Sequence, residues 1–204
     1  HAGTLDPAAA GVLPIAVGQA ARLIEYLELA DKTYRAELTF GFATDSGDDT
    51  GEITEEVADF AMPSQQAIEH ALLGFTGKIR QTPPAHSAIK IGGKRACDLL
   101  REGKEVEIPS REVTIHALDL VAYHPEEKKI LLDVQCSKGT YIRSLCLDIG
   151  AALGLPATMS FLVRSRVGDF ALADALTLEE LSEAGERAIL EPAHFLSHLE
   201  RYDL

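Results

Sequence analysis

The sequence contains no tryptophan, only three cysteines and no apolar run that approaches the length of a membrane span. A transmembrane helix needs about 20 consecutive apolar residues, so we expect no membrane segment. Cys97, Cys136 and Cys146 have neither CxxC spacing nor an even count, which indicates a reduced, cytoplasmic protein. The histidines are scattered, and no glycine-rich nucleotide-binding pattern occurs. We therefore expect no metal site.

Positive charge is also scarce, because 19 Lys and Arg residues face 32 Asp and Glu residues, a net charge of −13. Taken alone, this balance disfavours a polyanionic partner. The balance inverts locally between residues 76 and 104, where cations outnumber acids. Such a segment can contact phosphates, although a solvated surface of mixed charge explains the same pattern. Its cations are Lys78, Arg80, Lys90, Lys94, Arg95, Arg101 and Lys104.

Hydrophobic periodicity predicts a mixture of helices and strands without regular βαβ alternation. We therefore predict an α+β fold with a mixed, mainly antiparallel β-sheet flanked by helices. The expected strands are residues 32–42, 52–57, 112–123, 129–136 and 158–171. The expected helices are residues 19–30, 65–73, 94–101 and 140–153, with a last acidic helix from Thr177. Residues 78–92 are expected to form an exposed loop.

The N-terminal residues place one acid, Asp6, in a small-residue segment between Gly3 and Gly11. Pro7 restricts the backbone of Asp6 to extended or turn conformations. Local rules alone favour a helix N-terminus, with Asp6 as the N-cap and Pro7 at the first helical position. The alternative is a rigid turn that presents one carboxylate to a ligand.

Two long strings carry a resemblance. Gly3-Thr4-Leu5-Asp6-Pro7 with Ala10-Gly11-Val12-Leu13-Pro14 resembles the catalytic motif of the bacterial TruB-type tRNA pseudouridine synthases. Ser137-Lys138-Gly139-Thr140-Tyr141-Ile142-Arg143-Ser144-Leu145 resembles the strand-to-helix motif of the same family. The resemblance spans residues 1–172 and implies the pseudouridine synthase catalytic fold. The family has a further strand before this point, so we expect the chain to lack its N-terminal segment.

The resemblance implies an enzyme that converts uridine 55 in the tRNA T-loop to pseudouridine without a cofactor. The target base must be flipped out of its loop to expose the glycosidic bond. Asp6 is then the catalytic aspartate, either as a nucleophile at the sugar or as the group that assists glycal formation. Two other functions stay open, a guide-RNA-dependent synthase subunit and a non-catalytic module that binds or folds tRNA.

Three more residues receive catalytic roles from the resemblance. Tyr34 would stack on the base and is a candidate general base, although a strand tyrosine is ordinarily a packing residue. Arg143 would pair with Asp6 to keep it ionised and oriented, with a rim arginine at the core edge as the alternative. Asp48 would join the same arginine, although turn chemistry alone explains an aspartate there. A calcium loop from Asp45 fails because its sixth position is Thr50 rather than glycine.

The remaining implied roles concern the substrate. His1 would occupy the space left by the flipped nucleotide, while Tyr141 and Leu162 would shape the base pocket. Plain core packing is an equally simple interpretation of Leu162. The segment from Gln81 to Ala96 resembles the family's mobile RNA-binding insertion, with Cys97 where relatives commonly carry tyrosine. The implied RNA contacts are Lys78, Arg80, Lys90, Lys94 and Arg95.

These expectations divide the chain into two parts. Residues 1–172 would form the catalytic domain, with the RNA-binding insertion at about 78–105. Residues 173–204 would be an appendage, the start of a truncated second domain. We expect a monomer whose partner is the T-arm of tRNA.

Overall fold

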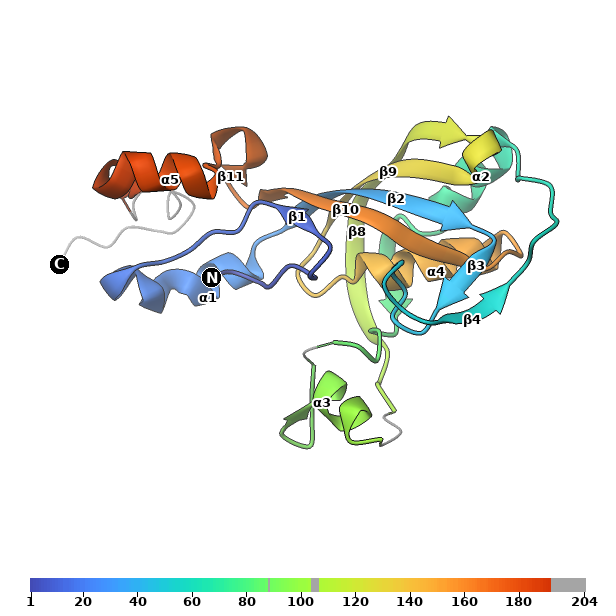
Figure 1. The fold of residues 1–204 in the computed structure, drawn as a ribbon, viewed down its shortest axis with the longest axis horizontal. Coiled ribbons are helices and arrows are strands. Elements are labelled where there is room, and N and C mark those ends of the chain that lie inside the picture. Colours follow the sequence, from blue (N-terminus) through green and yellow to red (C-terminus); the bar gives the residue numbers. More distant parts are fainter. Residues whose placement is uncertain (88, 104–106, 192–204) are drawn as a thin grey trace.

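The computed structural model describes residues 1–87, 89–103 and 107–191. A mixed sheet forms its centre, and all neighbouring strands are antiparallel except the first pair, β1 with β10 (Figure 1). The prediction of an α+β fold with a mainly antiparallel sheet is therefore confirmed. The strands in spatial order are β1 (Ala10–Gly11), β10 (Ala157–Val167), β2 (Lys32–Phe40), β9 (Lys129–Cys136), β8 (Arg111–His124) and β5 (Gly77–Gln81). The short β11 (Phe170–Ala171) folds back onto β10.

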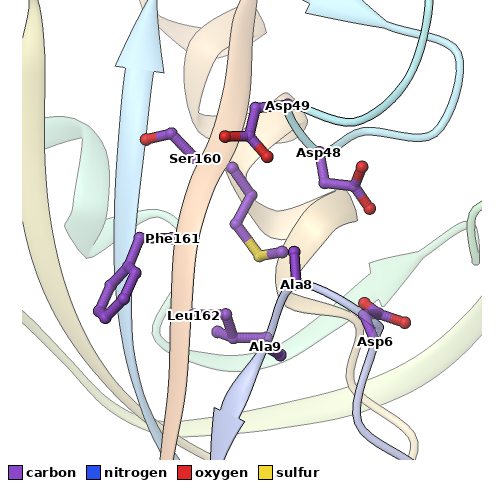
Figure 2. Close-up of a pocket in the computed structure, with 9 residues that line it drawn as sticks. Asp6, Ala8, Ala9, Asp48, Asp49, Ser160, Phe161 and Leu162 are labelled. Atoms are coloured by element: carbon purple, nitrogen blue, oxygen red, sulfur yellow. The ribbon is translucent and has the colours of Figure 1, made fainter.

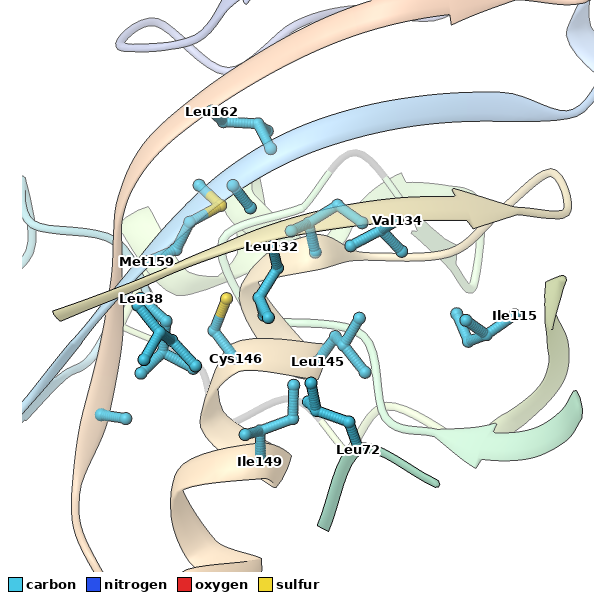
Figure 3. Packing of buried hydrophobic residues seen from close by; sticks show 14 of the residues in the cluster. Leu38, Leu72, Ile115, Leu132, Val134, Leu145, Cys146, Ile149, Met159 and Leu162 are labelled. Atoms are coloured by element: carbon cyan, nitrogen blue, oxygen red, sulfur yellow. The ribbon is translucent and has the colours of Figure 1, made fainter. Parts of the chain in front are cut away.

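One face of this sheet is covered by helix α4 (Ile142–Ala152) (Figure 3). The strands present alternate side chains to it, so that Leu38 of β2 and Leu132 of β9 are fully buried. Leu145 and Ile149 lie on the facing stripe of α4 and are also fully buried. This core fixes the start of α4 against the middle of the sheet.

Helix α2 (Gln65–Leu73) packs at the edge of the same core through Ile68 and Leu72. Its start agrees with the sequence, because the Ser64 hydroxyl accepts a hydrogen bond from the Ala67 amide at 3.3 Å. Helix α5 (Leu178–Ala184) likewise begins after the predicted Thr177, which forms a capping box with Glu180. Within the described ranges, no helix is both long and apolar enough to cross a bilayer.

The expected loop over 78–92 is partly wrong, because Gly77–Gln81 forms the edge strand β5 paired with β8. Ile79 and Gln81 point inward while Lys78 and Arg80 point to solvent. The cations on the exposed face hid this period-2 pattern in the sequence. Further along, the insertion forms a small hairpin of β6 (Lys90–Ile91) and β7 (Lys94–Arg95), followed by helix α3 (Ala96–Arg101).

Other boundaries also differ from the prediction: the helix expected over 94–101 begins only at Ala96, after β7, and the strand expected over 158–171 is divided into β10 and β11. The helix expected over 19–30 begins as a 3₁₀ helix, η1 (Gly18–Leu23), and becomes α-helical only in α1 (Ile24–Leu29). The first strand ends at Phe40 because Gly41 turns the chain with φ of +107°. The chain then forms a separate hairpin of β3 (Phe42–Thr44) and β4 (Ile53–Glu56). Residues 192–204 of the expected appendage lie outside the described residues.

Gly11 is the position where strand β1 comes closest to β10. Its φ is +119°, and a Cβ atom there would lie 2.2 Å from the main-chain oxygen of Arg164. We therefore expect Gly11→Ala to lower the free energy of unfolding by about 2 kcal/mol or more, because the chain must adopt a strained conformation and move away from β10. Urea denaturation measures this loss.

Gly18→Ala provides the matched control. Gly18 also has a positive φ, +61°, but a Cβ atom at this position would meet nothing within 4 Å. Its cost should be limited to the backbone strain of about 1 kcal/mol. Equal losses for the two variants would contradict the close approach of β1 to β10.

Candidate active site

The segment that carries Asp6 is a turn and not the start of a helix. The Ala9 amide donates to the Asp6 carbonyl at 2.9 Å, and the chain then enters β1. The interpretation of Asp6 as a helix N-cap is therefore wrong. The parallel pairing of Ala10 with Val163 of β10 attaches the turn to the edge of the sheet.

The turn forms one wall of a pocket. Five of the residues singled out in the sequence line it together, although they come from four separate segments of the chain. They are Asp6, Tyr34, Tyr141, Arg143 and Leu162.

An ion pair joins Asp6 to Arg143. The Asp6 Oδ2 atom lies 3.0 Å from Nε of Arg143, and the Nη2 group donates a hydrogen bond to Oδ1 at 3.2 Å. The Nε contact is an ion pair without hydrogen-bond alignment, so Nη2 makes the directional contact. The Arg143 side chain is only 5% exposed, whereas that of Asp6 is 35% exposed. Arg143 is thus a buried residue rather than a rim arginine, and Asp6 is its accessible partner.

The same guanidinium makes three other contacts. Its Nη1 group donates to the Ser46 carbonyl at 2.8 Å and lies 3.7 Å from Oδ2 of Asp48. Its Nη2 group also donates to the His86 carbonyl at 3.1 Å. Arg143 therefore connects Asp6 both to the turn that carries Asp48 and to His86 of the insertion.

Asp48 is held as a carboxylate by its own turn. Burial acts to raise its pKa, but hydrogen bonds from Thr50 and Ser46 and the charge of Arg143 outweigh burial and leave the pKa below its ordinary value. The Thr50 hydroxyl donates to Oδ1 of Asp48 at 2.6 Å, and the Ser46 hydroxyl donates to the same oxygen at 2.8 Å. The threonine that excludes a calcium loop thus serves to orient Asp48.

Tyr34 reaches the pocket from β2 and is half-buried. Burial raises the pKa of its phenol, and Cys136 raises it further, while the charge of Arg164 and a hydrogen-bonding interaction with it act in the opposite direction. The net shift is upward, so the phenol is protonated near neutral pH. This state suits stacking and hydrogen-bond donation better than general-base chemistry.

Tyr141 is positioned by a residue that received no role from the sequence. The Gln81 side chain, 1% exposed, donates to the Tyr141 carbonyl at 2.9 Å and accepts from the Tyr141 amide at 2.7 Å. The Arg111 guanidinium lies over the Tyr141 ring, 5.0 Å from its centroid. Gln81 belongs to the segment that resembles the insertion, but no neighbouring residue in the sequence indicates that its partner lies sixty residues away.

A second hollow adjoins the first, and Figure 2 shows it with Asp6 and Asp48 on one side of β10 and Phe161 pointing to the other. Leu162 lines both hollows. It is 7% exposed and also belongs to the hydrophobic core. Both interpretations of Leu162 therefore describe the same side chain, a core residue whose outer surface forms the pocket wall.

The implied RNA contacts lie on or near the insertion, which projects away from the sheet around α3 (Figure 1). Most of these cations already face acids of the same region. Lys94 lies 3.0 Å from Glu102, and Arg95 lies 2.7 Å from Asp98. On β5, where the insertion begins, Lys78 pairs with Glu112 at 3.0 Å, and Arg80 donates to Ser110. Lys90 is described by its main chain alone, in β6, and Lys104 lies outside the described residues.

His1 stands apart from this constellation. It is exposed and does not belong to either set of residues that line the two hollows. The structure thus brings Asp6, Tyr34, Arg143, Asp48, Tyr141 and Leu162 together and leaves His1 outside.

Comparisons with known proteins identify the family of this chain. A family model described as TruB family pseudouridylate synthase (N terminal domain) matches residues 1–142, and one described as tRNA pseudouridylate synthase B C-terminal domain matches residues 143–197. Together they define the class, a pseudouridylate synthase. The chain belongs to the TruB family.

Individual relatives support the assignment. A tRNA pseudouridine synthase B from Symbiobacterium thermophilum is 50% identical over 98% of this chain and 67% of its own length. One from Bacillus pumilus is 43% identical over the whole chain and 69% of its own length. The chain thus spans about two thirds of these relatives.

Solved structures show the same fold. A chain in a Cbf5–Nop10–Gar1 complex matches 93% of this chain and 48% of its own length, with a TM-score of 0.67 and 30% identity. A chain in an H/ACA RNP bound to a substrate RNA containing 2′-deoxyuridine matches 94% and 47%, with a TM-score of 0.62 and 28% identity.

Proposed function

We propose that this chain isomerises uridine 55 in the T-loop of tRNA to pseudouridine, with Asp6 as the group that acts at the sugar. The observation that carries this proposal is the shared pocket in which Asp6, paired to buried Arg143, faces Tyr34. The family membership and the relatives named tRNA pseudouridine synthase B support the reaction.

The reaction needs no cofactor because it is redox-neutral and confined to one nucleotide. The bond between N1 of uracil and C1′ breaks, the base turns, and a bond between C5 and C1′ forms. The proton of C5 is lost, and N1 gains one. A carboxylate beside C1′ assists either by direct attack or by helping to form a glycal, and both routes place Asp6 at the same point.

Each other pocket residue has a part in this proposal. The flipped base loses its stacking neighbours, and the Tyr34 ring offers a replacement surface. Tyr141 and Leu162 form the walls of the pocket. Arg143 orients the Asp6 carboxylate and supplies its counter-charge, while Asp48 fixes Arg143 from the opposite side.

The partner in this proposal is the T-arm of tRNA, bound outside the pocket by the insertion. Exposed cations there, such as Lys78 and Lys94, exchange their acidic partners for phosphates. We further propose a cytoplasmic monomer, with residues 1–172 as the catalytic domain and the residues from 173 onward as an appendage. The match to the first family model ends at residue 142, where α4 begins, yet α4 and β10 belong to the same core as the residues before them.

The likeness to chains from Cbf5 and H/ACA complexes raises one competing function, a subunit that needs a guide RNA. The higher identity to the relatives named tRNA pseudouridine synthase B favours the stand-alone form.

An unmodified tRNA transcript separates the two. We expect the purified chain alone to form pseudouridine at position 55, detected by carbodiimide adduct formation and primer extension, and to leave a transcript with cytidine at that position unchanged. Tight binding without turnover would support a non-catalytic module instead. Turnover only in the presence of a guide RNA would overturn the stand-alone assignment.

A further inference from the structure

Arg164 is a buried cation that the mechanism above does not use. It lies on β10, is 2% exposed and has the largest fully buried side chain among the described residues. Its hydrogen bonds run to main-chain carbonyls rather than to carboxylates: Nε donates to Val12 at 2.9 Å, and Nη2 donates to Gly3 at 3.1 Å. These two carbonyls stand on either side of Asp6 in the sequence. One side chain therefore holds both ends of the turn that carries Asp6.

The main chain of Arg164 grips the same turn. The Val12 amide donates to the Arg164 carbonyl at 2.8 Å, and Gly11 is paired with Arg164 in the parallel contact of β1 with β10. The beginning of the turn also lies close to Arg164, because a Cβ atom on Gly3 would lie 3.5 Å from Nη1 of Arg164. The turn is thus fixed to β10 at this residue by both side chain and main chain.

Arg164 also faces Tyr34. The two residues are direct partners in the antiparallel register of β10 with β2, which places their side chains on the same face of the sheet. The positive charge of the guanidinium acts on the phenol and favours its ionised form. The other charged or titratable groups near the phenol are Cys136 from β9 and Asp6 from the turn. Lys32 of β2 is in turn close enough to feel the charge of Arg164.

We infer that Arg164 is a positioning residue for the isomerisation: it clamps the Asp6 turn against β10 and presents a buried positive charge to the Tyr34 hydroxyl. Asp6 and Tyr34 must act on opposite parts of one nucleotide, the sugar and the base. The Arg164 side chain contacts the backbone that carries Asp6 and lies opposite Tyr34 in the sheet. It therefore sets the distance between Asp6 and Tyr34. This inference rests on the proposed function for its kinetic part only.

Two substitutions separate the two roles of Arg164. Arg164→Gln removes the charge, whereas Arg164→Lys keeps the charge but lacks the fork that spans the Gly3 and Val12 carbonyls. Arg166→Gln is the matched control, because Arg166 lies on the same strand and is exposed.

The first readout does not depend on turnover. Tyr34 is titrated by its ultraviolet difference spectrum, with Tyr34→Phe subtracted in each background. Because the Arg164 charge acts to lower the pKa of Tyr34, we expect Arg164→Gln to raise that pKa and Arg164→Lys to raise it less. Arg166→Gln should leave it unchanged. An unmoved titration in Arg164→Gln would overturn the electrostatic half of the inference.

The second readout is the split between kcat and KM for tRNA. We expect kcat to fall about 100-fold in both Arg164 variants, as for a small misplacement of reacting groups, while KM stays near the wild-type value. Wild-type kcat in Arg164→Lys would overturn the clamp. Should Arg164→Gln fail the circular dichroism check for folding, Arg164→Lys tests both halves: its kcat tests the clamp, and a Tyr34 pKa that does not rise at all would overturn the electrostatic half. Lack of turnover by the wild type would refute the proposed function and leave the titration result standing.

Discussion

Asp6→Asn is expected to abolish pseudouridine formation while tRNA binding persists. The substitution keeps the size and shape of the side chain, but the neutral amide can neither attack the sugar nor balance positive charge there. Removal of such a group lowers turnover by at least about 10³-fold. Binding should persist, because Asp6 lies inside the pocket and the exposed cations of the insertion are untouched. Single-turnover kinetics and filter binding on the same tRNA transcript measure the two quantities.

Asp49→Asn is the matched control for this experiment. Asp49 lines the neighbouring hollow and is exposed, so its substitution removes one carboxylate of equal charge near the same pocket. We expect Asp49→Asn to retain most of the wild-type turnover. A retained rate above one tenth in Asp6→Asn, or an equal loss in the two variants, would contradict the assignment of Asp6.

Loss of Arg143 is expected to damage both activity and stability. Arg143→Met fills a similar volume but leaves Asp6 without its counter-charge and Asp48, whose side chain is 11% exposed, without its cation. It also strands the Ser46 and His86 carbonyls, which lose their donors. Breaking a buried pair in this way costs about 3 kcal/mol in the free energy of unfolding. Urea denaturation gives the stability loss, and single-turnover kinetics should show at least a 100-fold slower reaction, a loss of about 2.7 kcal/mol in transition-state stabilisation.

The exposed pair of Arg35 with Asp133 provides a stringent comparison. It is bidentate, with hydrogen bonds of 2.8 and 2.7 Å, but both side chains are more than a third exposed. Arg35→Met should therefore cost much less stability than Arg143→Met, because solvent screens an exposed pair. Arg143→Lys should recover part of the stability but little activity, since lysine cannot hold two acids and two carbonyls at once. Equal losses for Arg143→Met and Arg35→Met would refute the buried role of Arg143.

The sequence alone could predict the elements whose periodicity is strong. The apolar stripe of α4, with Leu145 and Ile149, and the alternation of β9 both occur where expected. The edge strand β5 was not predicted. An edge strand tolerates cations on its open face, and Lys78 and Arg80 made this segment resemble a loop. Local rules also favoured the wrong structure for Asp6, since Asp-Pro is a common helix start as well as a turn.

The prediction of the site residues depended on the family resemblance more than on local sequence patterns. The helical wheel placed Arg143 beside the core, but no pattern stated which carboxylate it meets 137 residues away. Gln81 and Arg164 were missed for the same reason, because their partners are main-chain atoms of distant segments. Such contacts leave no periodic trace in the sequence.

The central place of β10 has a consequence for how the site comes into being. The strand meets the Asp6 turn through Arg164, pairs with β2 opposite Tyr34, and bridges to Asp48 through Met159. Residues 1–142 contain both acids that Arg143 holds, yet the two guanidinium groups that arrange the site, those of Arg143 and Arg164, come later. A nascent chain therefore carries Asp6 long before the two arginines that orient it, and the pocket is complete only once β10 has joined the sheet.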